Sequence, residues 1–133
     1  MGYYTTVFVD VRIPQDKIEA FHKEVNRIKD AINRAEKYGE ECLDEWFNYY
    51  WDISINDGGY IEFEEAHRKW YEEEKFYDWL LQFNPQGSII LIGESLDGAV
   101  VVFKDGKWAV YDIYEGVRCL EKHGDEFKAM MSS

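Results

Sequence analysis

Cysteine and proline are scarce in this chain of 133 residues, which contains two of each. Two cysteines are too few for a disulfide framework in a domain of this size. No apolar run approaches the roughly 18 residues needed to span a bilayer. Residues 1–4 lead directly into a strand pattern, without the basic segment and apolar stretch of a signal peptide. We therefore expect a cytoplasmic protein that does not bind membranes.

Basic residues are also few. The chain has 15 Lys and Arg against 27 Asp and Glu, which gives a formal net charge of −12 at pH 7. Such a charge repels phosphate and disfavours direct binding to nucleic acid. A hydrophobic content of 46% with 17% aromatic residues excludes a disordered chain. The length predicts a single domain over residues 1–133, with an ordered core at about 3–114 and a short helix and frayed tail at 115–133.

The acidic and aromatic residues of the chain concentrate between Glu36 and Gln82. This stretch holds 14 acidic and 4 basic residues and 13 of the 23 aromatic residues, whereas residues 1–35 carry 5 acidic and 6 basic residues. Clustered carboxylates attract basic surfaces or cations, and Trp and Tyr anchor cores and interfaces. The concentration favours a partner-binding surface in this stretch, against the alternative of a solvated face that keeps the protein soluble.

The first half of the chain predicts a strand, a long helix and a hairpin. Residues 3–13 alternate between apolar and polar, which is typical of a half-buried strand. From about Asp16 to Tyr38, apolar residues recur at spacings of three and four, which predicts a helix that ends at Gly39. Residues 47–55 alternate again, and a three-residue loop at 57–59 then sets Ile55 opposite Ile61.

The second half predicts one helix and three strands. The helix covers about residues 72–83, and the apolar run at 88–92 is typical of a central strand buried on both faces. After a turn at 96–98, a second hairpin joins residues 99–103 to 107–113 through Asp105-Gly106, a strong signal for a two-residue turn. Both faces of this hairpin are apolar, so one of those faces must meet either a helix or another subunit, which leaves a homodimer open.

These elements give the order β-α-β-β-α-β-β-β. Because helices separate groups of antiparallel strands, we expect an α+β fold. The predicted architecture is a single antiparallel-rich sheet with two main helices on one face, of the ferredoxin-like or split β-α-β type.

Five short motifs carry a resemblance to a known group of proteins. They are GYYT at residues 2–5, YIEFEE at 60–65, KWYE at 69–72, GE at 93–94 and KDGK at 104–107. Together they resemble a loose family of small acidic proteins of unknown function from phages, plasmids and their bacterial or archaeal hosts. The resemblance covers roughly residues 1–113. It implies a mobile-element context, in which small acidic proteins often blunt host defence by occupying nucleic-acid-binding surfaces, and it implies no catalytic residues.

The candidate partner-binding surface combines the carboxylates of the first hairpin with those of the second helix. The hairpin register sets Asp52 opposite Glu64, and like charges in that position are destabilising unless a cation or basic group meets them. Trp46, Tyr50, Trp70 and Tyr71 fall off the predicted inner faces, so we expect two or three aromatic anchors for a partner or a second copy. The predicted partner-binding residues are Asp52, Glu62, Glu64, Glu65, Trp70, Tyr71, Glu72, Glu73 and Glu74.

Metal and catalytic sites are disfavoured by residue spacing. The hairpin carboxylates lack the D-x-D-x-D-G pattern of a calcium loop. Cys42 stands alone, whereas structural zinc sites draw ligands in close pairs such as Cys119 and His123 would form. The GESLD segment at 93–97 nearly matches G-x-S-x-G, but it ends in Asp97 and connects two strands rather than a strand and a helix. We therefore expect no metal, no cofactor and no catalytic residue.

Two functions follow from these features. The first is a non-enzymatic acidic protein that occupies the basic surface of a nucleic-acid-handling partner without binding nucleic acid itself. The alternative is a protein that binds a small nucleotide-like ligand, either between the sheet and its helices or across a homodimer interface. The cations available to meet a phosphate in that case are Arg12, Arg68, Lys69 and Arg118.

Overall fold

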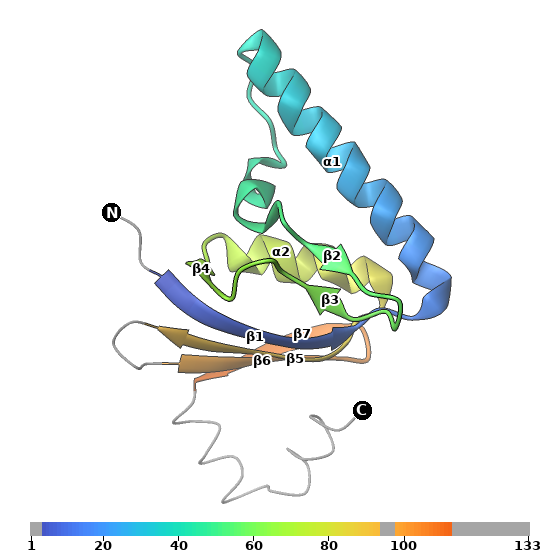
Figure 1. Ribbon diagram of the computed structural model, residues 1–133, viewed down its shortest axis with the longest axis vertical. Coiled ribbons are helices and arrows are strands. Elements are labelled where there is room, and N and C mark those ends of the chain that lie inside the picture. The colour runs from blue at the N-terminus through green and yellow to red at the C-terminus, as the bar shows by residue number, and fades with distance from the viewer. Residues whose placement is uncertain (1–3, 94–97, 113–133) are drawn as a thin grey trace, which may run out of the picture.

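The computed structural model describes residues 4–93 and 98–112 and has a mixed α+β architecture (Figure 1). This confirms the predicted α+β class. Several sequence-based predictions lie partly or wholly outside the described residues, namely the turn at 96–98, the GESLD segment, Arg118, Cys119, His123, and the C-terminal helix and tail. Among the described residues, no helix combines the length and the apolar composition needed to cross a bilayer.

The main sheet has five antiparallel strands in the order β4-β1-β5-β6-β7. The strands are β1 (Tyr4–Arg12), β4 (His67–Lys69), β5 (Gln86–Gly93), β6 (Gly98–Lys104) and β7 (Lys107–Asp112). β5 lies between β1 and β6, so its predicted central position is confirmed. The predicted turn at Asp105-Gly106 is also confirmed, because Phe103 pairs with Trp108.

The ferredoxin-like strand order is not confirmed. β1 pairs antiparallel with both of its neighbours, and one of these, β4, is a strand that the periodicity did not predict. β4 has only three residues and a polar sequence, so it carries no alternating pattern. Contacts with β1 hold it instead, because the His67 ring stacks on Tyr4 at 5.1 Å and its Nδ1 lies 3.3 Å from Thr6 Oγ1.

The long predicted helix is present as α1 (Ile18–Tyr38), which follows a short 3-10 turn at Gln15–Lys17. Gly39 ends it as predicted, with a left-handed φ of 65°, and its N–H bonds to the carbonyls of the last turn. The second helix, α2 (Glu73–Leu80), continues as a 3-10 turn at Leu81–Phe83. Figure 1 shows α2 lying across one face of the sheet and α1 rising diagonally away from it.

The predicted strand at 47–55 is wrong over most of its length. Residues Glu45–Tyr50 form a 3-10 helix, and strand pairing in this segment is limited to β2 (Ser54–Ile55) and β3 (Ile61–Glu62). These two strands form a separate two-stranded sheet, so the prediction of a single sheet is wrong. The predicted three-residue loop is nevertheless confirmed, because Ile55 pairs with Ile61. A strand would have sent Phe47 and Tyr50 to opposite faces, whereas a 3-10 helix brings residues three apart to the same face and buries both of them completely.

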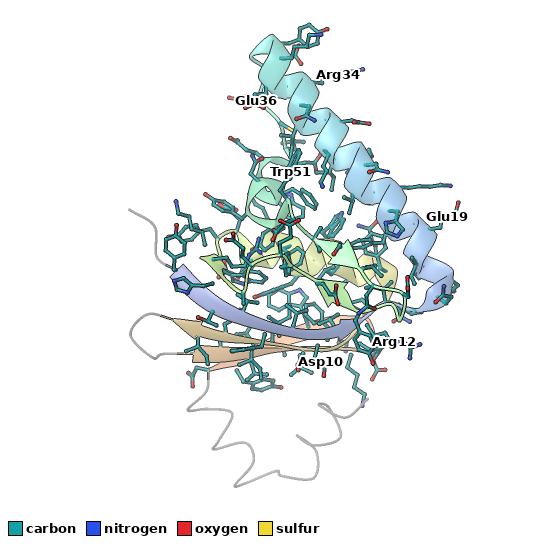
Figure 2. The ribbon with its side chains drawn as sticks, in the orientation of Figure 1. Asp10, Arg12, Glu19, Arg34, Glu36 and Trp51 are labelled. Atoms are coloured by element: carbon teal, nitrogen blue, oxygen red, sulfur yellow. The ribbon has the colours of Figure 1, made fainter. Side chains whose placement is uncertain are left out.

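The space between the helices and the sheet is filled by aromatic rings. Tyr50 stacks on Phe76 at 4.1 Å, and Trp70 meets Tyr50 edge to face at 4.9 Å. The predicted outward orientation of Trp46, Tyr50 and Trp70 is therefore wrong, since all three are buried. Figure 2 places Trp51 beside α1, and the Lys29 ammonium lies 5.0 Å from the centre of its ring.

Candidate functional site

Arg68 lies at the centre of the acidic stretch and connects three segments. Its guanidinium forms a bidentate ion pair with Asp52, with Nη1 donating to Oδ2 at 2.8 Å and Nη2 to Oδ1 at 2.6 Å. It also donates to the backbone carbonyls of Glu65 at 3.0 Å and Tyr49 at 2.8 Å. The Phe63 ring covers the guanidinium at 4.3 Å, and only 10% of the Arg68 side chain is exposed. This arrangement fastens the 3-10 helix, the β2–β3 hairpin and β4 together.

Asp52 is paired inside this cluster and does not present a free charge to a partner. The predicted like-charge confrontation with Glu64 is therefore wrong, because Asp52 Oδ2 accepts the backbone N–H of Glu64 at 3.0 Å while Arg68 neutralises its charge. Burial by itself would raise the pKa of Asp52. The hydrogen bonds and the charge of Arg68, with the help of backbone N–H groups, bring the net pKa below its ordinary value.

The sequence did not reveal this role for Arg68. Asp52 and Arg68 are 16 residues apart, which matches no local spacing of a helix or strand. The available signal was composition, because Arg68 is the only arginine between Glu36 and Gln82 among 14 acidic residues. A phosphate-binding role for Arg68, as the alternative function required, is disfavoured because Asp52 and two carbonyls already occupy both of its terminal nitrogens.

The remaining predicted carboxylates lie around this cluster and are largely exposed. Glu64 and Glu65 follow β3 and contact the Asp52–Arg68 pair through their backbones. Glu62 lies on β3, where its side chain accepts a hydrogen bond from Asn56 Nδ2 at 3.0 Å. At the start of α2, Glu72 is exposed and pairs with Lys75 at 3.0 Å. Glu73 and Glu74 occupy the first turn of α2, where the helix dipole favours negative charge.

Tyrosine contacts connect the hairpin side of this surface to the α2 side. The ring of Tyr49, whose carbonyl accepts from Arg68, meets the Tyr71 ring edge to face at 5.3 Å. The hydroxyl of the buried Tyr50 donates to the Tyr71 carbonyl at 2.7 Å. Tyr71 directly precedes Glu72, so these contacts hold the start of α2 beside the segment that binds Arg68. We call Glu64, Glu65, Tyr49, Tyr71, Glu72, Glu73 and Glu74 the acidic surface.

Trp70, one of the two predicted aromatic anchors, does not belong to this surface. Its side chain is buried, and its indole Nε1 donates to the Tyr77 hydroxyl at 2.9 Å. Burial raises the pKa of the Tyr77 hydroxyl, which stays protonated. Tyr71, the other predicted anchor, is half-buried.

A groove of about 420 Å³ opens between residues 42–49 and the first turn of α2. Glu45 and Glu72 contribute carboxylates to it, and Tyr49 and Leu43 contribute apolar surface. Leu43 is 98% exposed, which is unusual for a large aliphatic side chain. Lys75 also lines the groove, with its ammonium turned to Glu72. Alternating carboxylates and apolar groups match the chemistry of a long basic side chain, which has an apolar stem and a charged end.

Metal ligation finds no support in the described part of the chain, where no three His, Cys, Asp or Glu side chains gather as ligands. Asp52, the first of the hairpin carboxylates in the sequence, forms an ion pair with Arg68.

Comparisons with protein-family models, with curated proteins and with solved structures give no match to this chain. The resemblance to small acidic proteins of mobile elements therefore stays a prediction.

Proposed function

We propose that this protein is a non-enzymatic binding protein whose acidic surface receives a basic surface of a protein partner. If that partner handles nucleic acid, the carboxylates would compete with the phosphates of the nucleic acid for the basic surface of the partner. Such competition is in keeping with the mobile-element context that the resemblance implies. The observation that carries the proposal is the set of exposed carboxylates at Glu64, Glu65 and Glu74, which have no cationic partner within residues 4–93 and 98–112.

The cluster around Arg68 supports this proposal by keeping the surface in a fixed shape. Exposed charges on flexible chains bind weakly because ordering them costs conformational entropy. Here the backbones of Tyr49, Glu64 and Glu65 are each hydrogen-bonded to the Asp52–Arg68 pair. The carboxylates are therefore presented from a pre-organised frame, and the neighbouring groove adds apolar contact beside the charge.

The proposal is tested with a fluorescent arginine-rich peptide as the basic probe, whose binding is followed by fluorescence anisotropy. We expect binding that weakens as salt rises, because screening reduces attraction between exposed charges. The triple variant Glu64→Lys, Glu65→Lys and Glu74→Lys should weaken binding strongly while leaving the circular dichroism spectrum unchanged. With a partner recovered by affinity capture, the same variant should abolish the complex, and duplex DNA should compete for it.

A matched control carries the same change in net charge at other exposed positions. Glu19 and Glu36 lie at the two ends of α1, as Figure 2 shows, and Asp57 lies in the hairpin loop. The variant Glu19→Lys, Glu36→Lys and Asp57→Lys should retain most of the binding. If both triple variants weaken binding equally, net charge alone explains the attraction and the acidic surface is not a site.

The small-ligand alternative is favoured by one further feature, a cleft of about 470 Å³ beside Arg12. The Arg12 guanidinium lies 6.0 Å from the Tyr60 ring centre, and Gln86 and Asp10 also line the cleft. A cation beside an aromatic face suits a nucleotide-like ligand. A nucleotide that raises the melting temperature of the wild-type protein but not of the Arg12→Ala variant would support this alternative, and the absence of any such nucleotide would count against it.

A further inference from the structure

The five-stranded sheet has a second apolar face that no described helix covers. Successive strand residues point to opposite faces, and the face toward α2 holds core residues such as Val101 and Phe103. The residues between them point to the opposite face by strand alternation, and Figure 1 shows α1 and α2 on one side of the sheet, so no described helix covers that face. We call this the outer face; its apolar and aromatic residues are Phe8, Ile90, Ile92, Val100, Val102, Ala109 and Tyr111, and the polar residues Asp10, Ser88, Lys104 and Lys107 flank them.

The apolar residues at the middle of the outer face point to a cover. An antiparallel sheet with one solvated face normally carries polar residues on that face. Here Phe8 is 54% exposed, whereas Val102 on the same face is only 2% exposed. Directly opposite Val102 on the neighbouring strands lie the small residues Ser88 and Ala109, and the larger Ile90 and Tyr111 lie diagonally across from it. An apolar patch that holds both the exposed Phe8 and the buried Val102 is typical of a sheet face that another segment covers.

We propose that residues 113–133 of the same chain dock on the outer face. They follow β7 directly in the sequence, so they start at the edge of this sheet. Their apolar residues recur at spacings that suit one side of a helix. The stripe consists of Ile113, Val117, Leu120, Phe127 and Met131.

Length and charge favour this segment over a second copy of the protein. A helix over residues 113–131 would be roughly 28 Å long. The nine-residue strand β1 spans a similar distance, roughly 30 Å. Residues 113–133 carry 4 acidic and 3 basic residues, so their formal net charge is −1. A second copy of the chain would bring a net charge of −12 to a protein of the same charge, and the two would repel each other. The covalent link also gives the segment a high effective concentration at this face.

The proposal is tested by photo-crosslinking of the full chain with Phe8→p-benzoylphenylalanine. Phe8 is exposed on the outer face, so the larger aromatic group can be placed there without disturbing the core. We expect an intramolecular crosslink from position 8 to a peptide within 113–133, identified by mass spectrometry. The matched control, Tyr60→p-benzoylphenylalanine, replaces an exposed tyrosine near the β2–β3 hairpin and should give no crosslink to 113–133. A crosslinked dimer, or no crosslink from position 8, would overturn the proposal.

A second pair of variants separates docking from a general effect of added charge. Leu120→Asp places a carboxylate on the stripe, and Ala129→Asp places one on the opposite side of the same helical pattern. Leu120→Asp should raise the fluorescence of a dye that binds exposed apolar surface several-fold, while near-ultraviolet circular dichroism of the aromatic core is retained. Ala129→Asp should leave the dye signal at the wild-type level. Equal dye signals from both variants would contradict docking through the stripe.

Discussion

At the scale of single residues, Arg68 and Asp52 show how an acidic stretch is made compatible with a packed fold. The pair is mostly buried, and Arg68 satisfies two carbonyls in addition to the carboxylate. A buried ion pair adds little compared with apolar residues of the same size, but removing one partner leaves the other charge without compensation. Removal of the Asp52 carboxylate should therefore lower the free energy of unfolding more than removal of any neighbouring exposed carboxylate.

Asp52→Ala should therefore lower the free energy of unfolding by about 3 kcal/mol, because it leaves the Arg68 guanidinium buried without its carboxylate. Urea unfolding followed by tryptophan fluorescence measures the change. Glu64→Ala is the matched control, since only the backbone of Glu64 contacts the pair, and it should stay within about 0.5 kcal/mol of the wild type. A loss of the same size in both variants would contradict the structural role of the pair.

The same pair predicts a difference in acid stability. The pKa of Asp52 is lowered in the folded protein relative to an unfolded value of about 3.9. Its contribution is therefore fully present above the unfolded pKa and is lost as pH falls through the lower folded pKa. As pH falls through the unfolded pKa and then through the lower folded pKa, Asp52 takes up its proton and the stability gap between the wild type and Asp52→Asn should narrow. A gap that stays constant over this range would show that the charge of Asp52 does not stabilise the fold.

Gly87 is a second residue whose role is local and testable. It pairs with Val11 in the centre of the sheet at a φ of 131°, and a Cβ added there would overlap the Asp10 carbonyl oxygen. Gly87→Ala should prevent stable folding, as judged by circular dichroism. Gly106→Ala, at a φ of 74° with open space around it, should cost only about 1–2 kcal/mol. If Gly87→Ala destabilises the protein no more than Gly106→Ala does, the backbones of β1 and β5 do not approach as closely as described.

At the scale of elements, the 3-10 helix Glu45–Tyr50 decides which aromatic residues are inside. Its residues Trp46, Phe47 and Tyr50 are buried against α2, where Tyr50 stacks on Phe76. The same sequence also alternates like a strand, so periodicity alone cannot distinguish the two structures. The choice depends on the rings that α2 supplies.

The β2–β3 hairpin is held mainly by its loop, because only two residue pairs belong to its ladder. Asn56 Oδ1 accepts the backbone N–H groups of Gly58 at 2.9 Å and Tyr60 at 3.1 Å. Asn56→Ala should therefore lower the free energy of unfolding by about 1 kcal/mol. Asp57→Ala, in the same loop but without such contacts in the described structure, should be nearly neutral. Chemical denaturation of the two variants compares them, and a neutral Asn56→Ala would show that the loop forms without this side chain.

At the scale of the whole molecule, a net charge of −12 opposes the compact state through self-repulsion. Added salt screens exposed charges much more than the buried Asp52–Arg68 pair. The melting temperature should therefore rise between low and physiological salt. The Glu64→Lys, Glu65→Lys and Glu74→Lys variant, whose net charge is −6, should show a smaller rise in a thermal-unfolding series. A melting temperature that falls with salt would mean that exposed ion pairs outweigh the repulsion.

The sequence by itself determined the elements whose signals are local. The spacing of apolar residues and a left-handed glycine defined α1 and its end at Gly39, and Asp105-Gly106 defined the β6–β7 hairpin and its register. It also determined where the negative charge concentrates, because charge is a property of composition. These features depend on residues within a few positions of one another.

Only the tertiary structure decided the form of residues 45–50, the addition of β4 to the sheet and the pairing of Asp52 with Arg68. Each of these depends on groups far apart in the chain: α2 rings for the 3-10 helix, β1 for β4, and a partner 16 residues away for Asp52. Burial of a ring or neutralisation of a charge stabilises a segment only once its distant partner is in place. No local pattern in the sequence records that partner, so the acidic surface could be located from composition, whereas its frame could be seen only in the fold.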